Sequence, residues 1–209
     1  LASLIPRFYD ATAGTVLVDG LDVREYTFDA LYNKLGYVTQ KAVLFSGTVE
    51  DNVFFGQSAA EKTDASLQAA LSLSQAAEFV DKYPEKAAHP IAQLGRNVSG
   101  GQKQRLSIAR ALARTPEILI FDDSFSALDY KTDATLREGL AKELPGTTKI
   151  IVAQRISTIR NADQILVLDR GEIAGLGTHD ALMASCTVYR EIAMSQLSEE
   201  ELKKGGASK

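Results

Sequence analysis

The sequence predicts an α/β protein whose strands form a mostly parallel sheet. Three short apolar runs, EILIF at 117–121, KIIVA at 149–153 and QILVLD at 164–169, alternate with stretches that have helical spacing. Unbroken apolar runs of this length are typical of strands buried on both faces of a parallel sheet. By contrast, about residues 48–110 carry helical patterns without comparable strands, so we expect a helical subdomain inserted into the α/β core.

The composition is that of one globular domain with its own core. The chain has 209 residues, of which 45% are apolar and 24% charged, and this length can bury a sizeable core. A net charge of −4 gives no electrostatic reason to expect nucleic acid as a partner. The single cysteine, Cys186, excludes an intrachain disulfide framework, and we expect it to be a small apolar residue near a helix. We expect neither a membrane span nor a signal peptide.

The first forty residues predict a helix followed by two strands. Apolar residues recur at helical spacing at Leu1, Leu4, Ile5 and Phe8. No capping residue precedes Leu1, so we expect the chain to begin inside a helix and to lack the N-terminal part of its domain. The alternating segment TVLVDG at 15–20 and the segment KLGYVTQ at 34–40 predict strands.

The middle of the chain predicts helices separated by one loop. The pattern is mostly helical over 48–82, and Pro84, Pro90 and Gly95 then mark a loop. A second helical pattern, SGGQKQRLSIARAL, begins at Ser99, which we expect to cap it.

The C-terminal third predicts further elements in order: a helix over 132–144, a short strand over 171–177, a helix from His179 to Ala184 capped by Thr178, and a helix over 188–197. His179 starts its helix, so we expect it to have a surface role. The charged, Gly-containing segment 198–209 is expected to be a disordered tail, which leaves one domain over 1–197.

Two adjacent carboxylates end the most apolar strand, in the segment ILIFDD at 118–123. Buried parallel strands deliver ligand-binding residues at their C-terminal ends. Beside bound phosphates, Asp122 is suited to hold Mg²⁺ through water, and Asp123 is suited to polarise a water for attack on a phosphoryl group. Two solvated aspartates at a strand end are the simpler interpretation, and the pair alone does not decide between the two.

The segment NVSGGQKQR at 97–105 is suited to bind an anion. Gly100 and Gly101 lack side chains, so a ligand could approach the backbone where a helix begins. The free N–H groups and the helix dipole at that end favour phosphate. An ordinary Ser-capped helix with two flexible residues is the alternative.

Together these motifs resemble the nucleotide-binding domain of an ABC transporter, over residues 1 to about 197. The resemblance rests on SGGQ at 99–102, on ILIFDD at 118–123 and on SALD at 126–129. The segment LFSGTVEDNVFFG at 44–56 resembles the exporter branch of the family. The resemblance implies a P-loop NTPase (RecA-like) fold that uses ATP and Mg²⁺.

The resemblance also implies roles for single residues in this chain's own site. Gln40 would contact Mg²⁺ or its water and relay to the transmembrane domain. Asp122 would be the magnesium carboxylate, and Asp123 would stand at the catalytic carboxylate position. Gln154, in VAQRIST at 152–158, would stand in the switch segment.

Other residues would serve partners. The signature motif would contact the γ-phosphate of ATP held mainly by a second nucleotide-binding domain; its residues are Ser99, Gly100, Gly101 and Gln102. The loop that crosses the dimer interface would comprise Ser126, Ala127, Leu128 and Asp129. Leu94, Gly95 and Arg96 would lie where exporters meet the coupling helices of their transmembrane domain.

The chain departs from the family pattern in three ways. It contains no G-x-x-x-x-G-K-[ST] phosphate loop, and Leu1 resembles the residue just after such a loop, so we expect a domain truncated at its N-terminus. The usual catalytic Glu is Asp123, one methylene shorter, and a displacement of about 1 Å can cost on the order of 100-fold in rate. The usual switch His is Gln154, which cannot become cationic.

Both substitutions fall in the site formed by the chain's own motifs, whereas the signature motif is intact. This asymmetry resembles one half of a heterodimeric ABC exporter with one weak and one competent ATP site. We therefore expect an ATPase motor domain at the cytoplasmic face of a cell membrane, with a hydrolytically weak site of its own. A soluble ABC ATPase without a transmembrane partner, and an inactive truncated fragment, are the alternatives.

Overall fold

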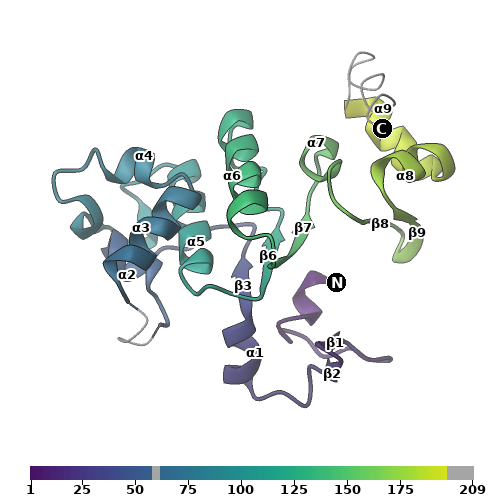
Figure 1. Ribbon diagram of the computed structural model, residues 1–209, viewed down its shortest axis with the longest axis horizontal. Helices are drawn as coiled ribbons and strands as arrows, with labels where there is room; N and C mark the ends of the chain where they lie inside the picture. Colours follow the sequence, from purple (N-terminus) through teal and green to yellow (C-terminus); the bar gives the residue numbers. More distant parts are fainter. Residues whose placement is uncertain (58–61, 197–209) are drawn as a thin grey trace. The chain divides into compact units, whose positions relative to one another are not determined.

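The computed structural model describes residues 1–57 and 62–196, and the chain divides into two compact units, Leu1–Val152 and Ala153–Lys209 (Figure 1). The segment 198–209, expected to be a disordered tail, lies outside the described residues. Within the described ranges, no helix has the length and apolar character that a membrane crossing requires.

A three-stranded parallel sheet forms the framework of the first unit. Its strands are β3 (Leu35–Val38), β6 (Ile118–Asp122) and β7 (Thr148–Val152), in the order β3-β6-β7. The predicted α/β class with parallel strands is therefore confirmed. The central strand β6 is buried from Leu119 to Phe121, as its apolar run predicts. The edge strand β7 is only partly buried, so the expectation of full burial for KIIVA is wrong, because among the described residues it pairs on one side alone.

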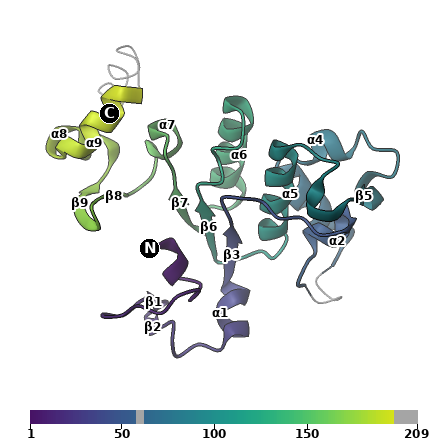
Figure 2. The same ribbon diagram turned by 180° about the vertical axis from the view of Figure 1, so that it is seen from behind.

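Helices of the first unit pack on this sheet and on one another. They are α1 (Phe28–Lys34), α2 (Val49–Val53), α3 (Asp64–Leu73), α4 (Ala77–Val80), α5 (Gly100–Leu112) and α6 (Tyr130–Glu143). Figure 2 shows α2, α4 and α5 gathered beside the sheet of the same unit. Short elements connect them: β4 (Gly47–Thr48), β5 (Pro90–Ile91), η3 (Lys86–Ala88) and η4 (Gln93–Gly95). Helices α2 to α5 lie within 48–112, with the two-residue strand β5 among them, and the helical subdomain over about 48–110 stays a prediction.

The N-terminal segment is less helical than its apolar spacing predicts. Only one 3₁₀ turn forms, η1 (Ala2–Leu4), and Arg7 has a left-handed φ of 57°. Pro6 supplies no N–H for a longer helix, and the left-handed residue after it turns the chain away. A small hairpin follows, β1 (Leu17–Val18) and β2 (Leu21–Asp22).

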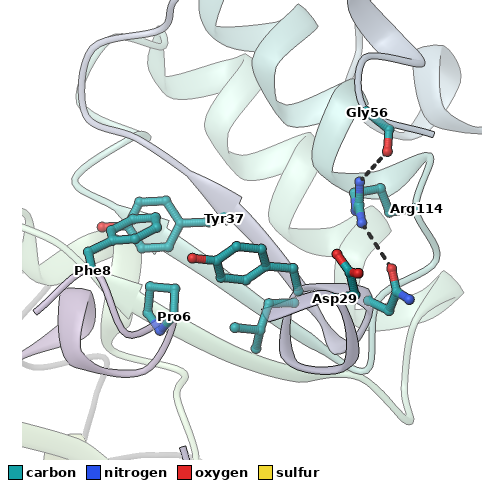
Figure 3. A pocket seen from close by; sticks show the side chains of 9 residues that line it. Pro6, Phe8, Asp29, Tyr37, Gly56 and Arg114 are labelled. Atoms are coloured by element: carbon teal, nitrogen blue, oxygen red, sulfur yellow. Dashed lines mark hydrogen bonds between the residues drawn. The ribbon is translucent and has the colours of Figure 1, made fainter. Parts of the chain in front are cut away.

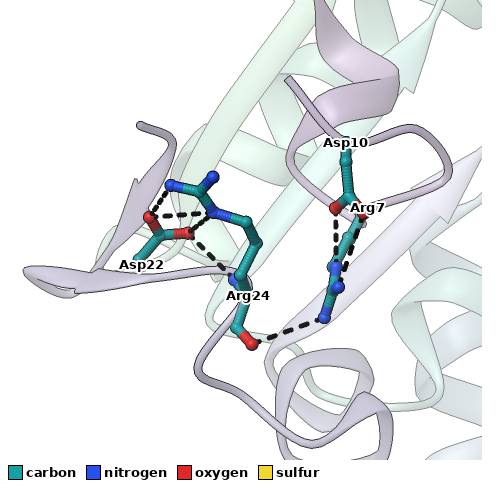
Figure 4. A network of polar contacts seen from close by, with 4 residues as sticks. All are labelled: Arg7, Asp10, Asp22 and Arg24. Carbon is teal, nitrogen blue, oxygen red and sulfur yellow. Dashed lines mark hydrogen bonds and ion pairs between the residues drawn. The ribbon is translucent and has the colours of Figure 1, made fainter. Parts of the chain in front are cut away.

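Two neighbouring ion pairs hold this N-terminal segment in place (Figure 4). Arg7 Nε donates to Asp10 Oδ1 at 2.7 Å, and Arg24 Nη2 donates to Asp22 Oδ2 at 2.6 Å. Arg7 also donates to the Arg24 carbonyl at 3.5 Å, which joins the two pairs. The hydrogen bonds from Arg24 lower the pKa of Asp22 to about 2.

A buried polar cluster around Asn52 joins α2 to α5. The Asn52 amide accepts from the Phe45 N–H at 2.8 Å and donates to the carbonyls of Phe45 and Thr48 at 2.9 and 3.0 Å. Arg110 of α5 donates to the Asn52 carbonyl at 2.7 Å and to its side-chain oxygen at 3.0 Å. Burial lowers the pKa of Arg110, and its guanidinium also lies over the Phe55 ring, 5.6 Å from the centroid. These contacts fix the segment that follows Gln40 against α5.

The second unit contains an antiparallel hairpin covered by helices. Its elements are α7 (Ile156–Ile159), β8 (Ile165–Asp169), β9 (Glu172–Gly177), α8 (His179–Ser185) and α9 (Thr187–Gln196). In this unit β8 pairs with β9, and Ile165 and Val167 are buried while Leu166 and Leu168 are exposed. The prediction of a fully buried parallel strand over 164–169 is therefore wrong for this unit. An apolar run does not distinguish a strand covered on both faces from one covered on a single face.

His179 and Cys186 belong to the small core of the second unit. His179 is buried, and its Nδ1 lies 2.8 Å from the Tyr189 hydroxyl, so the expectation of a surface role is wrong. Burial lowers the pKa of His179, with Arg160 acting in the same direction. Cys186 is buried at the end of α8, as expected of a small apolar residue near a helix.

Replacing Asn52 with Ala should destabilise the first unit. The change leaves the Phe45 N–H and part of the Arg110 guanidinium without their acceptor in a buried setting, which costs about 2–4 kcal/mol. Urea unfolding should show this loss, and Asn161→Ala, at an exposed position, should change the unfolding free energy by less than about 0.5 kcal/mol. An equal change in unfolding free energy in the two variants would contradict a stabilising role of the cluster.

Candidate nucleotide-binding site

The two carboxylates lie where β6 ends. Asp122 is the last residue of β6 and pairs with Val152 of β7. Asp123 follows with a left-handed φ of 48°, and its N–H still donates to the Val152 carbonyl at 3.0 Å. A positive φ is uncommon for a residue with a side chain and is often found at functional sites. Asp123 is nearly buried, at 7% exposure.

Strand β3 and the residues just after it supply a partner for each carboxylate. The Tyr37 hydroxyl donates to Asp122 Oδ2 at 2.7 Å, and Gln40 Nε2 donates to Asp123 Oδ2 at 2.9 Å. The structure thus brings together Gln40, Asp122 and Asp123, as predicted from motifs more than eighty positions apart. Parallel pairing of β3 with β6 puts their C-terminal ends at one edge of the sheet, where α/β proteins bind ligands.

The donor set fits Mg²⁺ more closely than a metal that needs a protein cage. In the described ranges no group of three or more His, Cys, Asp or Glu residues converges. Mg²⁺ is usually held by one or two carboxylates, with water and substrate phosphates completing its shell. Asp122, with Asp123 next to it in sequence, offers carboxylate oxygens of that kind.

The signature residues form the first turn of α5. Ser99 caps this helix through a reciprocal pair of bonds: the Gln102 N–H donates to Ser99 Oγ at 3.3 Å, and the Ser99 N–H donates to Gln102 Oε1 at 2.8 Å. At Gly100 an added Cβ would meet nothing within 4 Å, so the backbone there is open to approach. The 13 residues of α5 give this end a positive partial charge suited to an anion.

Residues after Asp123 form a tight loop that leads into α6. Ser126 Oγ donates to the Asp123 carbonyl at 2.7 Å, and Leu128 is buried. Asp129 caps α6, because its carboxylate accepts from the Thr132 N–H at 3.0 Å and from its hydroxyl at 2.7 Å. These bonds lower the pKa of Asp129. A Cβ at Gly101 would lie 3.6 Å from the Ala127 carbonyl oxygen, so this loop adjoins the signature turn.

Gln154 belongs to the second unit, where it lies just before α7. Its side chain is exposed. Its carbonyl accepts from Gln196 Nε2 at 2.7 Å, and Gln196 Oε1 accepts from the Ile156 N–H at 2.9 Å. One α9 side chain therefore anchors the backbone on both sides of Arg155. The role of Gln154 in catalysis stays a prediction.

Tyr37 and Gln104 contact the site or the residue before Gln40, and both are absent from the predicted set. Gln104 of α5 is buried, and its Nε2 donates to the Thr39 carbonyl at 3.2 Å, which ties the signature helix to the residue before Gln40. No signal in the sequence identifies Tyr37, because it is the β3–β6 pairing that brings its hydroxyl to Asp122. Helical spacing within 99–112 gives no signal for Gln104 either.

A pocket of about 370 Å³ lies on the first unit, with Tyr37 in its wall (Figure 3). Phe8 packs edge-to-face against Tyr37, with ring centroids 5.1 Å apart. Farther along the lining, Arg114 donates to the Gly56 carbonyl at 3.2 Å and to Asn33 Oδ1 at 3.3 Å. The pocket therefore shares one side chain, Tyr37, with the carboxylate site.

An exposed aromatic pair continues from the segment after Gln40. Phe45 and Phe55 stack with centroids 4.3 Å apart, and each keeps more than 40% of its surface exposed. Leu94, with a left-handed φ of 57°, is 54% exposed, and a Cβ on the neighbouring Gly95 would lie 3.2 Å from Leu44. Three large apolar side chains are thus exposed on segments that contact each other.

Comparison with known proteins identifies the family. The sequence profile of the ABC transporter family matches residues 1–126. An uncharacterized ABC transporter ATP-binding protein of Mycobacterium tuberculosis (strain ATCC 25618 / H37Rv) is 48% identical over 197 residues, which are 94% of this chain and 34% of the relative. An ATP-dependent lipid A-core flippase of Syntrophus aciditrophicus is 40% identical over 202 residues, which are 97% of this chain and 33% of that protein.

A solved structure shows the same fold. The structure of a bacterial Atm1-family ABC exporter with ATP bound superposes with a TM-score of 0.89 at 37% identity, over 95% of this chain and 35% of that one. The chain thus spans about a third of the length of the relatives it matches, 34% and 33% for the two proteins above. The α/β P-loop ABC ATPase fold with a parallel sheet is confirmed. The chain belongs to the ABC transporter family and is similar to the ATP-binding domain of its exporter-type members.

Proposed function

We propose that this chain is the ATP-binding motor domain of an ABC exporter, which couples ATP binding and hydrolysis to transport of a substrate across a membrane. The main support is the cluster of Gln40, Asp122 and Asp123 at one edge of the parallel sheet, in a chain similar to exporter domains. In this proposal Asp122 holds Mg²⁺, and Gln40 senses the ion or its water. Asp123 orients the attacking water.

The chain's own site is proposed to hydrolyse ATP slowly. Asp123 is one methylene shorter than the Glu usual at this position, and its carboxylate is held back by Gln40 at 2.9 Å. Gln154 can accept or donate a hydrogen bond but cannot take up a proton near neutral pH. In contrast, Ser99 to Gln102 keep a complete capping box and an open backbone, so the part that would serve a partner's site is intact.

Two kinds of partner follow from this function. A second nucleotide-binding domain, of a different subunit, would place its ATP against the first turn of α5. The coupling helices of a transmembrane domain would contact the exposed apolar side chains Phe45, Phe55 and Leu94, which leave this unit incompletely covered. The domain would then lie at the cytoplasmic face of a membrane.

Replacing Asp122 with Asn should remove the contribution of Mg²⁺ to nucleotide binding. Calorimetry on the protein expressed from its whole gene measures the affinity for a non-hydrolysable ATP analogue, first with Mg²⁺ and then with EDTA. The ratio of the affinity with Mg²⁺ to the affinity with EDTA should fall at least about 10-fold in the variant, because a neutral amide is a poor magnesium ligand. Asp169→Asn, also at a strand end, should leave the ratio unchanged, and an unchanged ratio in Asp122→Asn would refute the magnesium role.

Restoring the usual pair, Asp123→Glu with Gln154→His, should raise ATP turnover. A longer carboxylate and a titratable imidazole should raise the rate of the weak site by about 10- to 100-fold. Phosphate release at saturating ATP measures this. The same exchange at two exposed residues, Asp163→Glu with Gln164→His, serves as the control. Turnover that stays the same in both double variants would count against a weak site.

Replacing Ser99 with Ala should impair the partner's site more than it impairs folding. Loss of the cap costs about 1 kcal/mol of stability, and Thr63→Ala, which removes the similar cap of α3, should cost about the same. Only Ser99→Ala should also lower ATP turnover, about 10-fold, because only this hydroxyl would face the γ-phosphate. An equal decrease in ATP turnover in both variants would show that Ser99 acts only as a helix cap.

A further inference from the structure

The Tyr37 hydroxyl lies where it can orient the Asp122 carboxylate. In the β3–β6 register Tyr37 pairs with Ile120, two positions before Asp122, so the two side chains lie on one face of the sheet. The hydroxyl donates to Asp122 Oδ2 at 2.7 Å, a short, charge-assisted bond. Among the described residues, Tyr37 provides the one side-chain hydrogen bond to this carboxylate.

Packing holds the Tyr37 ring in the orientation that this bond needs. The ring meets Phe8 edge-to-face with an interplanar angle of 68° and forms part of the pocket wall (Figure 3). A donor whose ring is fixed in this way can set the orientation of the carboxylate that accepts its bond.

We propose that Tyr37 is a positioning residue for magnesium: it binds one oxygen of Asp122 and thereby leaves the other oriented toward the ion. The inference rests on the proposed magnesium role of Asp122. Hydrogen bonds to a ligating carboxylate commonly set its orientation, and their loss costs about 10- to 100-fold in metal affinity. The neighbouring Asp123 has its own donor in Gln40, so each acid is held by a different residue of one segment.

Tyr37→Phe removes the hydroxyl and keeps the ring against Phe8. The protein expressed from its whole gene is titrated with a non-hydrolysable ATP analogue, with Mg²⁺ and then with EDTA. The ratio of the two affinities should fall about 10-fold, while the affinity in EDTA stays the same. Tyr26→Phe is the matched control, because it also removes a tyrosine hydroxyl bond in this unit, to the Val18 carbonyl at 3.0 Å.

A double variant separates positioning from folding. In an Asp122→Asn background, Tyr37→Phe should lower the ratio no further, because its effect acts through the carboxylate. A further fall in that background would assign the effect to general structure and overturn the inference. The inference would also be overturned if Tyr37→Phe alone left the ratio unchanged or raised it while Asp122→Asn lowered it. The proposed function would stand in that case. If Asp122→Asn also leaves the ratio unchanged, both the inference and the proposed magnesium site are wrong.

Discussion

The parallel pairing of β3 with β6 is the constraint on which the candidate site depends. It places two short segments, far apart in sequence, in one register, with Tyr37 opposite Ile120 and Val38 opposite Phe121. The contact of Tyr37 with Asp122 then follows from strand geometry, because side chains alternate and both strands end at the same edge. A slip of one residue would turn Tyr37 away from Asp122. Complete burial of Leu119, Ile120 and Phe121 makes such a slip costly.

The helix α5 adds the second constraint. Gln104 holds the Thr39 carbonyl, and Arg110 holds the chain around Asn52, so one helix fixes both the residue before Gln40 and the segment after it. Its first turn carries the signature residues, and this turn adjoins the loop after Asp123 through Gly101 and the Ala127 carbonyl. The residues proposed to serve the two ATP sites of a dimer are thus connected through a single rigid element, not through a flexible linker.

Much of this arrangement could be predicted from the sequence, and the failures have physical causes. The apolar run over 118–121 predicts a strand buried on both faces of a parallel sheet, and β6 is buried from Leu119 to Phe121 because it pairs on both sides. The acids after it predict a ligand site. Apolar spacing at the N-terminus predicts a helix, but Pro6 and the left-handed Arg7 prevent it. His179 reads as a surface residue because its partner, the Tyr189 hydroxyl, comes from a separate helix. The hydroxyl of Tyr37 could not be assigned either, since only strand pairing brings it to Asp122.

Tyr37 lines a pocket, and its hydroxyl donates to Asp122, the carboxylate proposed to hold Mg²⁺. Thermodynamic linkage gives this double contact a consequence. If Asp122 holds an ion as proposed, a molecule that fills the pocket and shifts the ring would change the affinity of the site for that ion, and the ion would change the affinity for that molecule by the same factor. Tyr37 would then couple binding in the pocket to ion binding at the end of β6.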